Sequence, residues 1–392
     1  MKVTRTFHPV GQGAFYSERF YMVDQQGTVH NIVYDCGVKW GYKGKVKLVV
    51  TQAFTQSDVI EYLFISHLDY DHVSLVKTLI DNVRAVRNIV LPLVTEEQLV
   101  IALAYHKISG HKTMTDFISR ILNHLRGRGG EDFKDGEYTL HFVAGPDEEH
   151  LHVGNASIWQ NGTSQAAPWK PEWIFKPYNV KYSSRKQDLI AELAQLVMKR
   201  TFIAEIQNIG ENPIPTADEL YDKLKDDAFV RKVLSNDVLR GLLKGAYEKI
   251  SGGTNENSLL LYSGPISDDL DYYLKRCVPC EKFWCCRYEK AGCLYTGDST
   301  ADLSGWKTQK YDDVWGCVGT IQLPHHGSVD SFDVTTNSID RPYVVPVSFG
   351  NYNTYGHPSG KVLAYLIMKD CCIHFVTEMA NTVFIEEIEK WR

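Results

Sequence analysis

The chain has 392 residues, which is enough for two or three domains or for one large layered domain with insertions. Hydrophobic residues make up 44% and charged residues 23% of the sequence, which argues against a largely disordered, collagen-like or coiled-coil chain. The formal net charge of -6 gives no bulk attraction to polyanions, so a nucleic-acid substrate would have to bind a local patch. No apolar run reaches the ~18 residues of a membrane span, and the first residues lack the apolar core of a secretory signal, so we expect a cytoplasmic protein without membrane contact.

The first third of the chain is predicted to pass from strands into alternating strands and helices. Up to residue 65, apolar and β-branched residues lie between glycine-rich turns, which indicates strands. A strand at 60–66 is followed by helical spacing of apolar residues from Val73 to Arg84, by the strand RNIVLP, and by two helices within 95–127. This order is typical of a layered α/β domain.

Residues from about 184 to 250 differ from both flanks because their apolar residues follow only a helical period. Leu189, Leu193 and Leu196, for example, share one helical face. Basic and acidic residues are nearly equal in number here, so the segment is not a basic nucleic-acid arm. We expect a helical insertion that covers the core, contacts another copy of the chain or binds a protein partner.

Strands return after this insertion, followed by a helix at 359–368 and two closing strands. The returning strands are SLLLYSG, GCLYTGD, GTIQLPHH and RPYVVPVSFG. Two β-rich halves, each flanked by helices, predict one α/β unit over residues 1–392. We expect a four-layer αββα sandwich with the helical insertion at about 184–250.

The strongest chemical signal is the segment HLDYDH, which directly follows the strand at 60–66. It places His67, Asp69, Asp71 and His72 within six residues, at a turn where neighbouring side chains can point into one pocket. Imidazole together with carboxylate suits zinc, manganese or iron, and the second carboxylate favours a harder ion. The alternative is an ordinary surface turn.

Three later segments also place Asp or His at the end of a predicted strand. They are Thr296-Gly297-Asp298, Pro324-His325-His326-Gly327-Ser328 and Tyr355-Gly356-His357-Pro358. Each segment alone is a weak signal, because a turn or a loop would explain it. Taken together with HLDYDH, they place candidate ligands at the ends of four strands.

In this order, HLDYDH, TGD, HHGS and SFGNYNTYGHP resemble the metallo-β-lactamase superfamily, in particular its H-x-D-x-D-H branch. That branch includes the hydrolase domain of competence DNA-uptake channels and the bacterial phosphorylcholine esterases. VGQG at 10–13, YDCG at 34–37 and NSL at 257–259 are similar to further segments of the branch. The resemblance covers roughly 7–100 and 255–385, and it implies a four-layer metallo-β-lactamase sandwich with a dinuclear metal site.

The resemblance also implies a ligand set. His67, Asp69 and His326 would hold one ion, Asp71, His72 and His357 the other, and Asp298 would bridge them. The cofactors would be two divalent metal ions, with zinc expected first and manganese as the alternative. His325 and Asp69 are the candidate catalytic residues, His325 either as an acid or oxyanion donor or as a histidine that orients the pocket. Asp35 would support the turn at 67–72.

Two divalent ions ~4 Å apart can lower the pKa of a bridging water and neutralise charge on a leaving group. The first hypothesis is therefore a metal-dependent hydrolase with a bridging hydroxide and phosphodiesterase or nuclease-like activity, acting on a phosphate-containing substrate such as a nucleic acid or nucleotide. A second hypothesis keeps the metals but hydrolyses an ester, thioester or lactam. A third is a binding or scaffold protein that uses the helical insertion and has a vestigial metal pocket.

A cysteine cluster suggests a separate structural zinc. Cys277, Cys280, Cys285 and Cys286 could supply four thiolates, although the second pair lacks the usual two-residue spacer. The alternative is free thiols in a hairpin.

Lysines and aromatic residues interleave at 39–47, which predicts either a loop that guides a phosphate-bearing or single-stranded ligand or a solvated hairpin. Tyr70, Tyr352 and Tyr355 lie beside the candidate ligands in sequence. They would either line the pocket or pack on their own loops.

Overall fold

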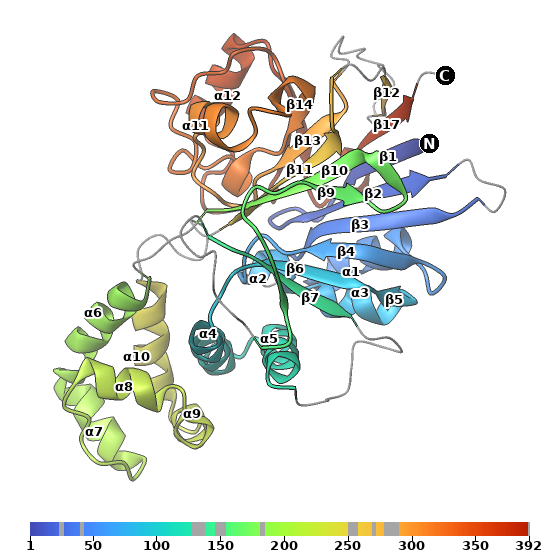
Figure 1. Ribbon diagram of the computed structural model, residues 1–392. Helices are drawn as coiled ribbons and strands as arrows, with labels where there is room; N and C mark the ends of the chain where they lie inside the picture. Colours follow the sequence, from blue (N-terminus) through green and yellow to red (C-terminus); the bar gives the residue numbers. More distant parts are fainter. Residues whose placement is uncertain are drawn as a thin grey trace.

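The protein is described by a computed structural model that covers residues 1–22, 27–39, 43–127, 138–145, 154–180, 185–249, 258–268, 272–277 and 290–390. Two β-sheets pack face to face, and helices cover both outer faces (Figure 1). The four-layer αββα sandwich predicted from the sequence is therefore confirmed. No helix in the described ranges combines the length and the apolar character needed to cross a membrane.

The first sheet joins an antiparallel half to a parallel half at β3. Its strand order is β12 (Tyr272–Cys277), β17 (Phe384–Lys390), β1 (Lys2–Phe7), β2 (Phe15–Tyr21), β3 (Val29–Cys36), β4 (Val59–Phe64), β6 (Asn88–Pro92), β7 (Thr139–Val143) and β8 (Ser157–Trp159), and β5 (Ala85–Val86) pairs with β4. β3, β4, β6, β7 and β8 run parallel to one another. Parallel strands end at the same edge, so the loops after β3 and β4 meet there.

The second sheet is also divided into an antiparallel half and a parallel half. Its order is β16 (Cys372–Val376), β15 (Val344–Ser348), β14 (Val318–Ile321), β13 (Gly292–Tyr295), β11 (Leu259–Pro265), β10 (Lys170–Asn179) and β9 (Gln165–Ala167). The four strands from β13 to β16 are parallel. Aromatic side chains fill the space between the sheets, where the rings of Tyr34 and Tyr295 stack with centroids 5.0 Å apart.

Helices that cover the first sheet pack on a second apolar core. They include α1 (Lys43–Ala53), α3 (Val76–Asn82), α4 (Glu96–Ile108) and α5 (Lys112–Leu125), and α12 (Gly360–Met368) covers the other sheet. The prediction of a loop or hairpin through 39–47 is wrong from Lys43 onward, where α1 begins. Val46 and Val50 explain the helix, because their spacing of four residues puts both on the buried face.

Residues 185–249 form five helices beside α4 (Figure 1). They are α6 (Arg185–Val197), α7 (Arg200–Asn208), α8 (Ala217–Lys223), α9 (Asp227–Leu234) and α10 (Asp237–Glu248). These helices have an apolar core of their own, and Ile101, Ala104 and Ile108 of α4 belong to it. The insertion thus shares its core with α4, the helix that follows β6 of the first sheet.

Candidate metal centre

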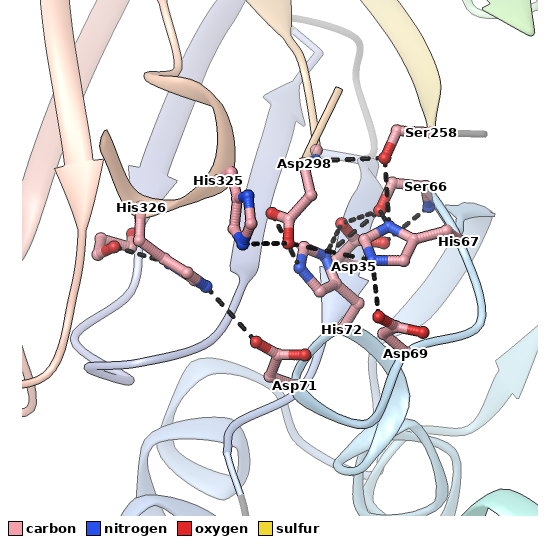
Figure 2. A network of polar contacts seen from close by, with 12 residues as sticks. Asp35, Ser66, His67, Asp69, Asp71, His72, Ser258, Asp298, His325 and His326 are labelled. Atoms are coloured by element: carbon pink, nitrogen blue, oxygen red, sulfur yellow. Dashed lines mark hydrogen bonds and ion pairs between the residues drawn. The ribbon is translucent and has the colours of Figure 1, made fainter. Parts of the chain in front are cut away.

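The predicted ligands gather at the edge of the sandwich where the parallel strands end (Figure 2). β4 leads into Ser66–Asp69 and the short helix α2 (Tyr70–Val73), and β13 leads into Thr296–Asp298. β14 leads into the turn at 324–327. Strand ends from both sheets therefore supply the side chains of one site, as expected for parallel sheets.

Asp35 fixes the start of this loop. Its backbone is left-handed, with φ of 55°, which turns the side chain from the end of β3 toward β4. The buried carboxylate accepts hydrogen bonds from Ser66 N (2.7 Å), Ser66 Oγ (2.7 Å) and His72 Nδ1 (2.8 Å). Burial raises the pKa of Asp35, and the interaction with His72 acts against that rise. One carboxylate thus orients the loop and a candidate ligand, as predicted for Asp35.

His67 and His72 are both held through Nδ1. Ser66 Oγ lies 2.9 Å and Ser258 Oγ 3.2 Å from His67 Nδ1, and Asp35 holds Nδ1 of His72. The Nε2 atoms of both rings are buried and make no hydrogen bond among the described residues. A buried nitrogen without a hydrogen bond is costly in a folded protein, and a metal ion would satisfy it.

Asp298 faces these two rings. Its Oδ1 lies 3.1 Å from His72 Nε2, and its Oδ2 lies 4.0 Å from His67 Nε2. The preceding Gly297 has φ of +54°, and a Cβ there would lie only 2.8 Å from the Cβ of Ser66. Gln322 Oε1 accepts hydrogen bonds from the backbone N–H groups of Thr296 and Gly297, at 2.8 and 2.9 Å, and so fixes the turn that carries Asp298.

His326 approaches from the second sheet. His325, His326 and Gly327 have φ of 47°, 54° and 80°, a left-handed run that turns both imidazoles out of the strand direction. His326 Nδ1 donates to the carbonyl oxygen of Ser348 at 2.8 Å, which leaves Nε2 facing Asp71 Oδ2 at 3.4 Å. His326 therefore presents Nε2 to the site.

The two central histidines of the site have opposite pKa shifts. Burial, and next the neighbouring His72, lower the pKa of His67 to about 3, so His67 is neutral at physiological pH. Burial also acts to lower the pKa of His72, but Asp298 and Asp35 raise it well above its usual value. For Asp298, burial is outweighed by the positive His72, so its pKa lies well below the ordinary range.

Asp71 and His326 form a second pair. Burial acts to raise the pKa of Asp71, but the hydrogen bond from His326 and the charge of His72 hold it at about 2. The pKa of His326 is raised, because Asp71 and Asp298 outweigh the effect of burial. The protonated nitrogens of His72 and His326 therefore lie beside carboxylate oxygens. A metal ion that replaced these protons would be surrounded by imidazole nitrogens and carboxylate oxygens.

Among the described residues, two groups of side chains bring together enough ligand atoms to hold a metal ion. They are His67, His72 and Asp298, and Asp71, His72 and His326, and within each group one ligand atom per residue lies within 4.8 Å of the others. Nitrogen and carboxylate ligands suit zinc and manganese. The two buried Nε2 atoms, which face carboxylate oxygens without a hydrogen bond among the described residues, and this donor set fit a metal ion.

The remaining predicted residues lie around these groups. Asp69 is at the rim, with Oδ2 3.7 Å from His67 Nε2. His325 has Nε2 3.8 Å from Asp298 Oδ2, and the ring of His357 lies 5.5 Å from that of His325. His357 belongs to neither ligand group, and burial followed by His325 lowers its pKa to about 4. The structure thus pairs His326 with Asp71, whereas the resemblance implied that His326 accompanies His67 and Asp69.

A cavity of about 290 Å³ opens over the two groups. Besides candidate ligands, it is lined by Gln12, Lys39, Tyr70, His111 and Tyr355. Tyr70 and Tyr355 thus line the pocket, whereas Tyr352 is 81% exposed and does not. Lys39 Nζ lies 3.9 Å from the ring centroid of Tyr355, which holds one cationic group at this wall.

Other anchors of the site were not predicted from the sequence: Ser66, Ser258, Gln322 and the carbonyl of Ser348. The predicted cysteine cluster lies outside the described residues at 280, 285 and 286, and the side chain of Cys277 is also not described. The lysine-rich segment is likewise not described at 40–42.

Comparisons with known proteins add little to this geometry. No protein-family model matches the chain, and no curated protein matches it. Among solved structures, it is similar to a long form RNase Z from yeast, with 11% sequence identity and a TM-score of 0.31. The match covers 82% of this chain and 32% of that one, so the chain spans about a third of its length.

Proposed function

We propose that the protein is a metal-dependent hydrolase that cleaves phosphodiester bonds at the site formed by the two ligand groups. The observation that carries the proposal is the pair of buried Nε2 atoms of His67 and His72, which make no hydrogen bond and face the carboxylate of Asp298. Their Nδ1 atoms are held by Ser66, Ser258 and Asp35, an arrangement typical of histidines that bind metal ions.

His72 belongs to both ligand groups, and Asp298 lies between His67 and His72. We assign the first ion to His67, His72 and Asp298 and the second to Asp71 and His326, with Asp69 and His357 at the rim. When bound, two divalent ions supply Lewis acidity, an activated water and compensation for charge on the leaving group.

Lys39 and His325 are the residues of this chain that would act on the substrate. The ammonium group of Lys39 lies on the cavity wall, where it would attract an anionic phosphodiester. His325 is held by the contact of its Nδ1 with Ser331 Oγ, at 2.8 Å, and its side chain is 28% exposed in the same cavity. It can carry a proton on Nε2 and transfer it to the departing oxygen when the bond from phosphorus to that oxygen breaks.

The ligand types favour a phosphodiester over an ester, thioester or lactam. Two or more carboxylates beside the imidazoles make the site suitable for harder ions, which prefer phosphate oxygens, and Lys39 adds a positive charge. An acyl substrate without charge would gain nothing from Lys39.

The test is turnover by the zinc and manganese forms with bis(4-nitrophenyl) phosphate, 4-nitrophenyl acetate and nitrocefin. We expect hydrolysis of the phosphodiester, a fall of at least about 100-fold in His72→Ala, and little change in His374→Ala, a histidine remote from the site. Turnover of only the acyl substrates would contradict the proposal.

A scaffold protein would behave differently. Its biological activity would persist in Asp71→Ala and disappear when residues 185–249 are removed.

A further inference from the structure

A second cavity lies between the helical insertion and the metal loop. Its volume is about 120 Å³, and its walls come from α4, from α6, α8 and α10, and from residues 67–69. The insertion is thus one wall of a pocket that reaches His67 and Asp69 of the candidate metal centre.

The lining of this pocket is mostly apolar and includes Tyr105, Tyr221 and Tyr247. The rings of Tyr105 and Tyr247 are stacked, with centroids 4.7 Å apart. Tyr247 is buried, and its hydroxyl donates to the carbonyl oxygen of Ile101 at 3.0 Å, so its ring is fixed against α4. Rigid aromatic walls favour a flat ring as the occupant.

The volume of the pocket and the charged groups beside it further restrict the chemical class of ligand that it can bind. A dry apolar cavity of roughly 150 Å³ accepts one benzene molecule, so this pocket suits a single ring. The ammonium groups of Lys186 and Lys225 already lie 5.1 and 4.9 Å from the ring centroid of Tyr221. Both lysines are ion-paired with Glu97, so the aromatic end of the pocket has no charge left to compensate an ionised ring, which favours a neutral ring.

Asp69 connects this pocket to the metal cavity, because it lines both. His67 also lines the aromatic pocket, and its Nε2 is 4.0 Å from Asp298 Oδ2 on the metal side. A ligand that extends past Asp69 from one cavity into the other would place one end against the tyrosines and the other among the metal ligands.

We infer that the substrate is a phosphate ester with a neutral aromatic ring, and that the ring binds among Tyr105, Tyr221 and Tyr247 while the phosphate lies over His67 and Asp298. This inference rests on the proposed function, since it takes the phosphate to the metal centre. The ring can be a simple aryl group or a nucleobase, which share the flat, neutral surface that the pocket fits.

The test is calorimetric titration of the zinc-loaded protein with phenyl phosphate, methyl phosphate and thymidine 5′-monophosphate. Phenyl and methyl phosphate have the same charge and differ in the ring. Burial of one ring predicts that phenyl phosphate binds at least about tenfold more tightly than methyl phosphate. Thymidine 5′-monophosphate should bind like phenyl phosphate if the natural ring is a nucleobase, and like methyl phosphate if it is a simple aryl group.

Two variants test whether the preference for phenyl phosphate over methyl phosphate arises in this pocket. Ala102 lines the pocket, so Ala102→Phe should fill it and abolish the preference for phenyl phosphate. Ala191→Phe adds the same volume on the exposed face of α6 and should keep the preference.

Equal affinities of the wild-type protein for phenyl and methyl phosphate would overturn the inference, as would a preference that survives in Ala102→Phe. The proposed function fails separately, if the ring preference holds but bis(4-nitrophenyl) phosphate is not hydrolysed.

Discussion

Asp35 Oδ2 accepts a hydrogen bond from His72 Nδ1 at 2.8 Å, and this contact directs Nε2 of His72 toward Asp298. The carboxylate belongs to β3, whereas the histidine belongs to the short helix after β4. The geometry of the candidate ligand therefore depends on a residue that would not itself touch the metal.

Asp35→Asn isolates the role of this charge. Asparagine tolerates the left-handed backbone that Asp35 has, so the fold should persist, but the side chain loses one of two acceptor oxygens and its charge. We expect metal affinity to fall about 10- to 100-fold, measured by competition with a chromophoric chelator. Asp81→Asn, at an exposed residue of α3, serves as the control, and equal affinities in the two variants would contradict the prediction.

Gly37→Ala tests whether the loop is positioned by backbone packing. A Cβ at Gly37 would lie 2.4 Å from the carbonyl oxygen of Asp71, so α2 must move and carry Asp71 and His72 with it. Metal affinity and the melting temperature should both fall. Gly44→Ala is the matched control, because nothing lies within 4 Å of its Cβ and alanine favours the helix α1. If Gly37→Ala bound metal as the wild type does, this account of the loop would be wrong.

The ligand-bearing segments were predictable from sequence because each directly follows a strand. HLDYDH, TGD and HHGS therefore have a defined place at one edge of the sandwich. The partner of His326 was not predictable, since it depends on the left-handed run from His325 to Gly327, for which only the glycine gives a local signal.

The anchors of the site were also hidden from sequence reasoning. Gln322 is an ordinary polar residue at a strand end, and its role comes from the pairing of β13 with β14. α1 was missed because lysine and glycine around Val46 obscured the helical spacing of its buried valines. Both the role of Gln322 and the formation of α1 thus depend on tertiary packing, which the local sequence does not show.

A buried ion network between the sheets predicts a large effect on stability. Arg5, Glu18 and Glu386 are fully buried, and the guanidinium contacts the two carboxylates at 2.7 and 2.8 Å. Arg5→Met would leave two buried carboxylates without their partner, so we expect the free energy of unfolding to fall by about 3–5 kcal/mol in urea titrations. Lys2→Met on the same strand removes only the partly exposed pair with Glu387, and should cost less than about 1 kcal/mol. Similar losses in the two variants would contradict this role for Arg5.

His8 predicts a dependence of stability on pH. Burial, and then the charge of Arg19, lower its pKa to about 3, compared with 6.5 for an unperturbed histidine. The neutral form is thus favoured in the folded state, so the contribution of His8 is present above pH 6.5 and is lost as the pH falls toward 3. Between pH 7 and 5 the wild type should lose about 2 kcal/mol through this group, and His8→Gln should not.

Urea titrations in the presence of a chelator would measure this difference without a contribution from bound metal. The two proteins should have parallel profiles above pH 7 and diverge below pH 6.5. Parallel profiles down to pH 5 would show that His8 does not cause the effect.

The most direct test is the metal content of the purified protein after incubation with zinc or manganese and removal of free ions, measured by elemental analysis. The account predicts two ions per chain in the wild type and loss of the first ion in His72→Ala, because Nε2 of His72 binds that ion together with His67 and Asp298. A wild-type protein that takes up neither metal, or a His72→Ala protein that still holds two ions, would contradict it.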